Sequence, residues 1–214
     1  MKPCRDSVMD PRFKHPFTCI VAGPSQSGKT EWVKQLITKM ENMIVPPPTK
    51  VVWHYGIWQD GYKDIQTKVD FVPGLDGLGD TFENAPLLVV IDDLMDEMDK
   101  RVLDMFTKKS HHQNTSIILI VQNLFADKKF FRTVSLNAHY LVVFENARDR
   151  QQITALARQL EPNRSRAVVE AFEDAVKDPH GYLLIDCAPG TPRNIRYRTD
   201  IFSSEPTVYV IKNT

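Results

Sequence analysis

The chain has 214 residues, 42% of them hydrophobic and 25% charged, which is enough for one sizeable globular domain with its own core. Its 27 Lys and Arg balance 27 Asp and Glu, which excludes a global positive field that would coat nucleic acid non-specifically. No apolar run reaches the ~18 residues that span a bilayer, and the three cysteines show no C-x-x-C pattern or disulfide framework, so we expect an intracellular protein without a membrane anchor.

Apolar and amphipathic segments alternate along the chain. The strand-like segments are 17–23, 50–56, 68–74, 85–94, 115–123, 138–146, 181–188 and 194–202, and the helix-like segments are 31–43, 95–110, 148–160 and 164–177. Continuous apolar strands are typical of an α/β fold whose mostly parallel sheet is covered by helices on both faces. We expect the last strands to form an antiparallel C-terminal extension. Residues 1–16 read as a polar arm, 17–202 as the domain and 203–214 as a tail or small extra strand.

Residues 23–30 read GPSQSGKT and match the phosphate-loop pattern G-x-x-x-x-G-K-[ST] at every fixed position. A strand pattern precedes them and a helix pattern follows, so backbone N–H groups at the helix start can cradle phosphates. We therefore predict a P-loop NTPase that binds ATP. The predicted binding residues are Gly23, Pro24, Ser25, Gln26, Ser27, Gly28, Lys29 and Thr30, with Lys29 reaching the β- and γ-phosphates and the Thr30 hydroxyl ligating Mg²⁺.

Two aspartates follow the apolar run LLVVI, at the carboxyl end of a predicted strand. In an open α/β sheet this end is where ligands bind. We assign Asp92 to Mg²⁺, directly or through water. Asp93 is then placed to polarise an attacking water, with a helix cap as the alternative role.

The run TSIILIV ends in Gln122 and Asn123, which the same topology brings to the same edge of the sheet. An amide there can hydrogen-bond the γ-phosphate and the attacking water, so Gln122 is a predicted catalytic sensor. The alternative is a polar end to a core strand. His111 and His112 lie at the opposite end of this strand, where we favour a structural or inter-subunit role over contact with a nucleic-acid backbone.

Four segments in this order resemble the small genome-packaging ATPases of double-stranded DNA viruses: GPSQSGKT, VVIDDL, SHHQNTSIILIVQNLF and FENARDRQQITALARQL. These belong to the FtsK/HerA superfamily, in the poxvirus-like branch with Polinton (Maverick) elements. The resemblance covers roughly residues 17–188. The histidine-pair strand and the helix after it are more specific than the phosphate loop, which many NTPases share.

The resemblance implies a homo-oligomeric ring, a hexamer or pentamer, that hydrolyses ATP at subunit interfaces and moves double-stranded DNA into a preformed capsid. It implies a viral capsid or vertex protein as partner, and a location in the infected host cell. Lys29, Thr30, Asp92 and Gln122 match the family's functional positions. Many superfamily members have Glu where this chain has Asp93, so the shorter carboxylate must sit closer to its water.

Ring ATPases of this kind use an arginine from the neighbouring subunit. We place Arg148 first among the candidates, which also include Arg132, Arg150 and Arg158, while a solvated helix face remains the alternative for this charge run. The candidate DNA-facing basic residues lie at 108–109, 128–132 and 193–198, where Arg196 and Arg198 are expected on one strand face.

The main alternative function is a P-loop nucleotide or nucleoside kinase. Such kinases carry an arginine-rich lid, for which we find no clear pattern. A GTPase would need an N-K-x-D pattern, which is absent. A DNA-binding or capsid-docking subunit with a degenerate site is disfavoured by the intact Lys29, Thr30 and Asp92.

Overall fold

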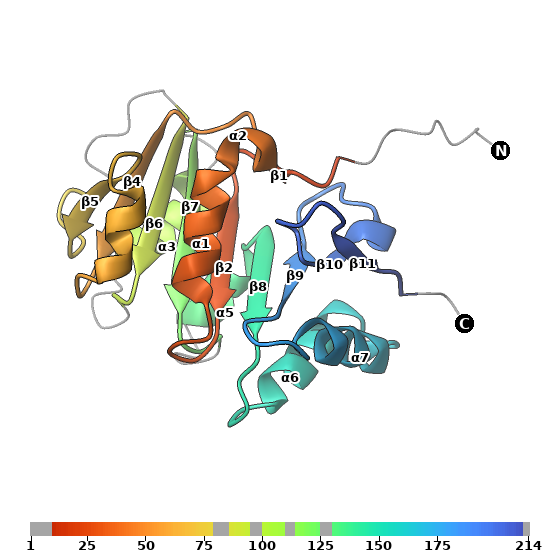
Figure 1. The fold of residues 1–214 in the computed structure, drawn as a ribbon. Coiled ribbons are helices and arrows are strands. Elements are labelled where there is room, and N and C mark those ends of the chain that lie inside the picture. Colours follow the sequence, from red (N-terminus) through yellow and green to blue (C-terminus); the bar gives the residue numbers. More distant parts are fainter. Residues whose placement is uncertain (1–9, 79–85, 95–99, 110–113, 125–129, 212–214) are drawn as a thin grey trace.

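The computed structural model describes residues 10–78, 86–94, 100–109, 114–124 and 130–211 (Figure 1). Nine strands of this described part form one sheet in the order β11-β10-β9-β8-β2-β7-β6-β4-β5. Their bounds are β2 Thr18–Ala22, β4 Lys50–Tyr55, β5 Asp70–Pro73, β6 Leu87–Asp92, β7 Thr115–Val121, β8 Tyr140–Phe144, β9 Tyr182–Asp186, β10 Tyr197–Thr199 and β11 Thr207–Tyr209. Each of the eight predicted strands is present, although most are shorter than the apolar segments suggested.

The sheet has a parallel part and an antiparallel part. Strands β8, β2, β7, β6, β4 and β5 run parallel, whereas β9, β10 and β11 continue from β8 in antiparallel pairs. The predicted α/β class with an antiparallel C-terminal extension is therefore confirmed. Part of the segment expected as a tail forms β11, so it adds an edge strand to the sheet.

Helices cover both faces of the sheet, as predicted from the continuous apolar strands. The helical elements are α1 Lys29–Thr38, α2 Met40–Met43, η1 Asp60–Ile65, α3 Lys100–Asp104, the π-helix η3 Met105–Lys109, α5 Phe130–Leu136, α6 Gln151–Leu160, α7 Ser165–Ala175 and η4 Arg193–Ile195. Figure 1 shows α1 in front of the sheet and α3 behind it. One buried cluster joins the sheet to α1 and η1, and the other joins it to α3, α5, α6 and α7.

The helix predicted over 31–43 is broken at Lys39, so that α1 and α2 are separate. The Thr38 hydroxyl donates to the Lys34 carbonyl at 2.8 Å, a contact that competes with the regular ladder and bends helices. Ile44 and Val45 then form the short strand β3, which pairs with β1 at Phe13–Lys14.

The described part of the predicted N-terminal arm packs on the domain. Phe13 is 1% exposed and its ring lies 4.5 Å from that of Tyr140. The Pro11 carbonyl accepts a hydrogen bond from Arg198 on β10. None of the helices in these described ranges combines the length and apolar character that a bilayer span requires.

Candidate nucleotide-binding site

The phosphate loop leaves β2 and enters α1, as the motif predicted. Gly28 takes the N-cap position of α1 with φ 104°, a left-handed conformation that glycine adopts without strain. A Cβ at Gly23 would lie 2.7 Å from Phe144 Cβ and 2.8 Å from Ser27 Oγ. Glycine is therefore required at position 28 by the backbone conformation and at position 23 by close packing.

Lys29 folds back over the loop, where its Nζ donates to the Pro24 carbonyl at 2.7 Å. Burial lowers the pKa of Lys29, and the charges of Asp92 and Asp93 oppose that shift by favouring the ammonium. The lysine is thus a partly desolvated cation beside the loop, which is the charge that a triphosphate requires.

Asp92 ends β6 and is buried, with two hydroxyl groups donating to its Oδ2. The Thr30 hydroxyl lies 3.3 Å away and the Tyr62 hydroxyl 2.9 Å away. Burial raises the pKa of Asp92 to about 6, while the hydrogen bond from Tyr62 lowers it. No ion pair joins Asp92 to any residue in the described ranges.

Thr30 and Asp92 fit the magnesium site that the sequence predicted. A hydroxyl and a carboxylate within hydrogen-bond distance are hard oxygen donors, the type that Mg²⁺ prefers together with phosphate oxygens. The nearby charge of Lys29 only partly offsets the burial of this carboxylate, whose pKa stays raised.

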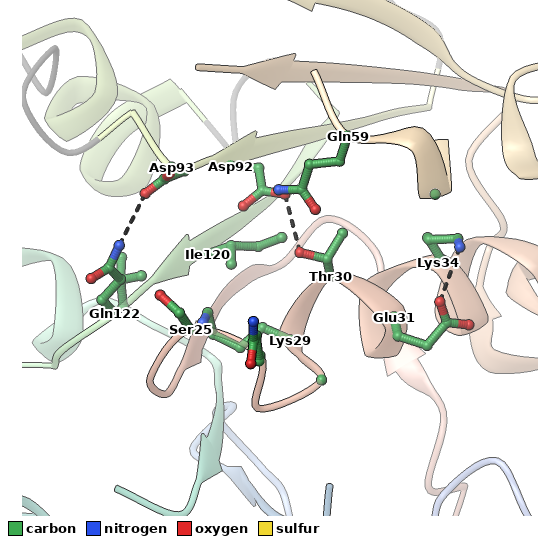
Figure 2. A pocket seen from close by; sticks show the side chains of 14 residues that line it. Ser25, Lys29, Thr30, Glu31, Lys34, Gln59, Asp92, Asp93, Ile120 and Gln122 are labelled. Carbon is green, nitrogen blue, oxygen red and sulfur yellow. Dashed lines mark hydrogen bonds and ion pairs between the residues drawn. The ribbon is translucent and has the colours of Figure 1, made fainter. Parts of the chain in front are cut away.

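Asp93 and Gln122 come from neighbouring strands and contact each other, as Figure 2 shows. The Gln122 amide donates to Asp93 Oδ1 at 3.3 Å. Asp93 lies just past β6 with φ 55°, a turn in the backbone that follows the last strand residue. The prediction that these two polar ends meet at one edge of the sheet agrees with this geometry. The alternative cap role of Asp93 concerns residues 95–99, which lie outside the described part.

Gly56 lets the end of β4 approach these acids, a feature that sequence reasoning missed. Its N–H donates to the Asp92 carbonyl at 3.2 Å, and a Cβ there would lie 2.7 Å from the Asp93 carbonyl oxygen. A glycine after a predicted strand is the signal that could have indicated it.

These side chains line one cavity of about 470 Å³ (Figure 2). The predicted residues that line it are Ser25, Gln26, Gly28, Lys29, Thr30, Asp92, Asp93 and Gln122. Pro24 and Ser27 line a second hollow, where His180 Nδ1 lies 3.2 Å from the Ser27 carbonyl oxygen. The sequence prediction thus identified most of the cavity, whereas Tyr62, which holds Asp92, had no sequence signal.

Arg148 lies in the exposed turn after β8 and does not line this cavity. Its N–H donates to Asn146 Oδ1 at 3.1 Å. Arg150 pairs with Glu145 at 3.4 Å, and Arg158 is exposed on α6. The side chain of Arg132 lies outside the described part. The assignment of a trans-acting arginine stays a prediction.

The predicted DNA-facing role of Arg198 is wrong. The side chain is 2% exposed and pairs with Asp186 at 2.7 Å. The strand begins only at Tyr197, so Arg196 precedes it and lies 3.6 Å from Glu161. The side chains of Lys108 and Lys109, and residues 111, 112 and 128, lie outside what the structure describes.

Comparison with solved structures defines the class of the fold. No family model matches the chain, and no curated protein matches it either. The genome packaging NTPase B204 of Sulfolobus turreted icosahedral virus 2, in complex with ATPγS, is similar with a TM-score of 0.56 at 12% identity, over 94% of this chain and 98% of that one. Its sulfate complex matches with a TM-score of 0.55 at 13% identity, over 84% and 93%. The fold is that of a P-loop NTPase.

Proposed function

We propose that this chain is a P-loop ATPase that uses Mg²⁺ as cofactor. The main support is the convergence of Lys29, Thr30, Asp92, Asp93 and Gln122 on one cavity. These side chains come from the phosphate loop and from two other strands, so their meeting depends on the whole parallel sheet. A glycine-containing turn that matched the motif by accident would not be expected to share a cavity with the buried carboxylate of Asp92.

Each residue has a step that its position supports. Lys29 and the first N–H groups of α1 bind the phosphates, because they present positive charge without a bulky side chain. Thr30 and Asp92 hold Mg²⁺, which neutralises phosphate charge when bound. Asp93 orients the attacking water and accepts its proton, since it follows Asp92 directly and lines the same cavity.

Gln122 reports the state of the γ-phosphate. Its amide is bonded to Asp93 at 3.3 Å, a long contact that a phosphate oxygen can replace. Loss of the γ-phosphate would return the amide to Asp93. The sensor and the base are therefore coupled through one hydrogen bond.

We further propose that the ATPase works as a homo-oligomeric ring, a hexamer or pentamer, that moves double-stranded DNA into a viral capsid in the infected cell. The proposal rests on the resemblance to the poxvirus-like and Polinton branch of packaging ATPases, and on the likeness in fold to a protein titled a genome packaging NTPase. Arg148, exposed after β8, is the arginine proposed to act on a neighbour's nucleotide, and a capsid or vertex protein is the proposed docking partner.

The first test measures phosphate release from ATP without a nucleoside acceptor, with and without duplex DNA. We expect turnover that duplex DNA stimulates. Lys29→Ala should reduce it by at least about 100-fold, because removing a charge-stabilising donor from such a site costs about 3 kcal/mol or more. Lys68→Ala, at an exposed lysine outside the cavity, is the matched control and should leave the rate unchanged.

Equal rates in wild type and Lys29→Ala would rule out the phosphate-loop assignment. Phosphate transfer only when a nucleoside or nucleotide acceptor is added would favour the kinase alternative. Turnover that duplex DNA leaves unchanged would retain the ATPase and remove the support for a DNA motor.

A further inference from the structure

The short helix η1 reaches the nucleotide site from the connection between β4 and β5. Its residue Tyr62 is 1% exposed, and its hydroxyl donates to Asp92 Oδ2 at 2.9 Å. The proposed chemistry assigns no step to this tyrosine. A buried hydroxyl aimed at the metal-binding carboxylate nevertheless affects where that carboxylate points.

One ion pair holds η1 beside the phosphate-loop helix, and a second pair lies within that helix. Lys34 on α1 is 7% exposed, and its Nζ lies 2.7 Å from Asp64 Oδ2 on η1. The same Nζ lies 3.0 Å from Glu31 Oε2, one turn earlier on α1 (Figure 2). Lys34 is one helical turn beyond Thr30. The helix that starts at the phosphate loop therefore also fixes the element from which Tyr62 approaches Asp92.

Aromatic packing fixes the ring of Tyr62. It stacks on Phe71 with ring centroids 5.0 Å apart and planes inclined by 22°, and it contacts Trp53 at 5.3 Å. These contacts restrict the movement of the buried ring, so the hydroxyl is held near Asp92 before any metal binds.

Tyr62 and Thr30 donate to the same carboxylate oxygen, whereas no described residue donates a hydrogen bond to Asp92 Oδ1. When the Thr30 hydroxyl turns to a metal, as its proposed role requires, Tyr62 still satisfies Oδ2. The carboxylate then keeps its orientation and presents Oδ1 to the cavity.

We propose that Tyr62 is a positioning residue for Asp92, which raises the affinity of the site for metal-bound over metal-free nucleotide. The inference rests on the proposed nucleotide-binding function. It follows the general behaviour of groups that hydrogen-bond a metal ligand, whose loss typically costs 10- to 100-fold in metal affinity.

The test is calorimetric titration with ATPγS, once with excess Mg²⁺ and once with EDTA. Tyr62→Phe keeps the ring and removes only the hydroxyl. We expect its affinity in Mg²⁺ to fall about tenfold, with affinity in EDTA unchanged. Tyr55→Phe is the matched control, because Tyr55 belongs to the same aromatic cluster and its hydroxyl makes no hydrogen bond to Asp92.

A second variant keeps the inference testable if Tyr62→Phe fails to fold. Asp64 is exposed, so Asp64→Asn loosens η1 without disturbing the core. It should reduce the Mg²⁺-dependent affinity about twofold to threefold, the size expected for an exposed ion pair.

Two results would overturn the role of Tyr62. One is wild-type affinity for Mg²⁺–ATPγS in Tyr62→Phe, and the other is an equal loss with Mg²⁺ and with EDTA, which indicates a structural effect only. If wild type binds ATPγS in neither condition, the proposed function itself fails and the inference with it.

Discussion

Asp92 and Asp186 are both buried aspartates at the last position of a strand, and their surroundings differ. Asp92 ends β6 and is 3% exposed, while Asp186 ends β9 and is 4% exposed. Asp186 accepts hydrogen bonds from Arg198 at 2.7 Å, from the Thr191 hydroxyl at 2.8 Å and from the Ala188 N–H at 3.1 Å. Within the described ranges, the Asp92 carboxylate accepts hydrogen bonds only from the hydroxyls of Thr30 and Tyr62.

These different surroundings indicate a structural role for the charge of Asp186 and a functional role for the charge of Asp92. A buried carboxylate is costly unless a cation and hydrogen bonds compensate it. Asp186 has both, because β10 returns antiparallel to β9 and places Arg198 beside it. Asp92 forms no ion pair with a described residue, and burial raises its pKa to about 6 although the nearby charge of Lys29 opposes that rise. A bound Mg²⁺ would supply further positive charge beside this carboxylate.

The largest change in stability is expected when the ion pair between Asp186 and Arg198 is broken. Arg198→Met should lower the free energy of unfolding by about 3–5 kcal/mol, because it leaves the buried Asp186 carboxylate without its cation. Urea unfolding followed by circular dichroism measures it. The double variant Arg198→Met with Asp186→Leu removes both charges and should recover most of the loss. A stable single variant would mean that Asp186 does not depend on this partner.

Removing the charge of Asp92 should raise the free energy of unfolding, which is the opposite of the effect expected for Arg198→Met. The folded-state pKa of Asp92 is about 6 against an ordinary value of 3.8, so the folded state binds the proton more tightly and ionisation opposes folding. That cost is absent below about pH 4, grows between pH 4 and 6, and is complete above pH 6. Asp92→Asn carries no charge, so it should be more stable than wild type by about 3 kcal/mol at pH 8.

Urea unfolding of Asp92→Asn and wild type at pH 5 and pH 8 measures this difference, which should shrink as the pH falls. Asp186→Asn serves as the comparison and should be destabilised, because it leaves Arg198 unpaired. Destabilisation of Asp92→Asn at pH 8 would contradict the inference that the charge of Asp92 is only partly compensated in the folded protein.

The smallest expected effects distinguish two threonines, each of which donates to one of the acids. Thr191→Ala should cost about 1 kcal/mol of unfolding free energy, the typical net value of one hydrogen bond. Thr30→Ala should cost less, since its contact is longer at 3.3 Å and alanine is favourable in a helix. Denaturation measures both. Equal losses of unfolding free energy would mean that the two hydroxyls stabilise the folded protein to the same extent.

The sequence predicted those parts of the fold and site that depend on local pattern. Continuous apolar runs located the strands, and parallel order then brought Asp92 and Gln122 to the edge where the phosphate loop lies. Because every parallel strand ends at that edge, the meeting of these side chains follows from topology without knowledge of packing.

The sequence pattern could not predict contacts that depend on how the segments between strands pack against the sheet. Tyr62 lies in a connection without periodicity, so its path back to Asp92 is decided by aromatic packing and by Lys34. Arg198 was misplaced on the surface because its inward direction depends on an acid of the neighbouring strand. The helix break at Lys39 likewise lies beside a side-chain hydrogen bond, from Thr38 to the Lys34 carbonyl, that the apolar pattern does not indicate.

We infer that Mg²⁺ bound with a nucleotide balances the charge of Asp92, and thermal unfolding tests this inference. Wild type is unfolded thermally at pH 8 with ATPγS, in the presence of Mg²⁺ and in the presence of EDTA. We predict that Mg²⁺–ATPγS raises the melting temperature well above that seen with ATPγS and EDTA, and that Asp92→Asn loses this metal-dependent part. Equal melting temperatures of wild type with Mg²⁺ and with EDTA would contradict the inference that Mg²⁺ binds beside Asp92.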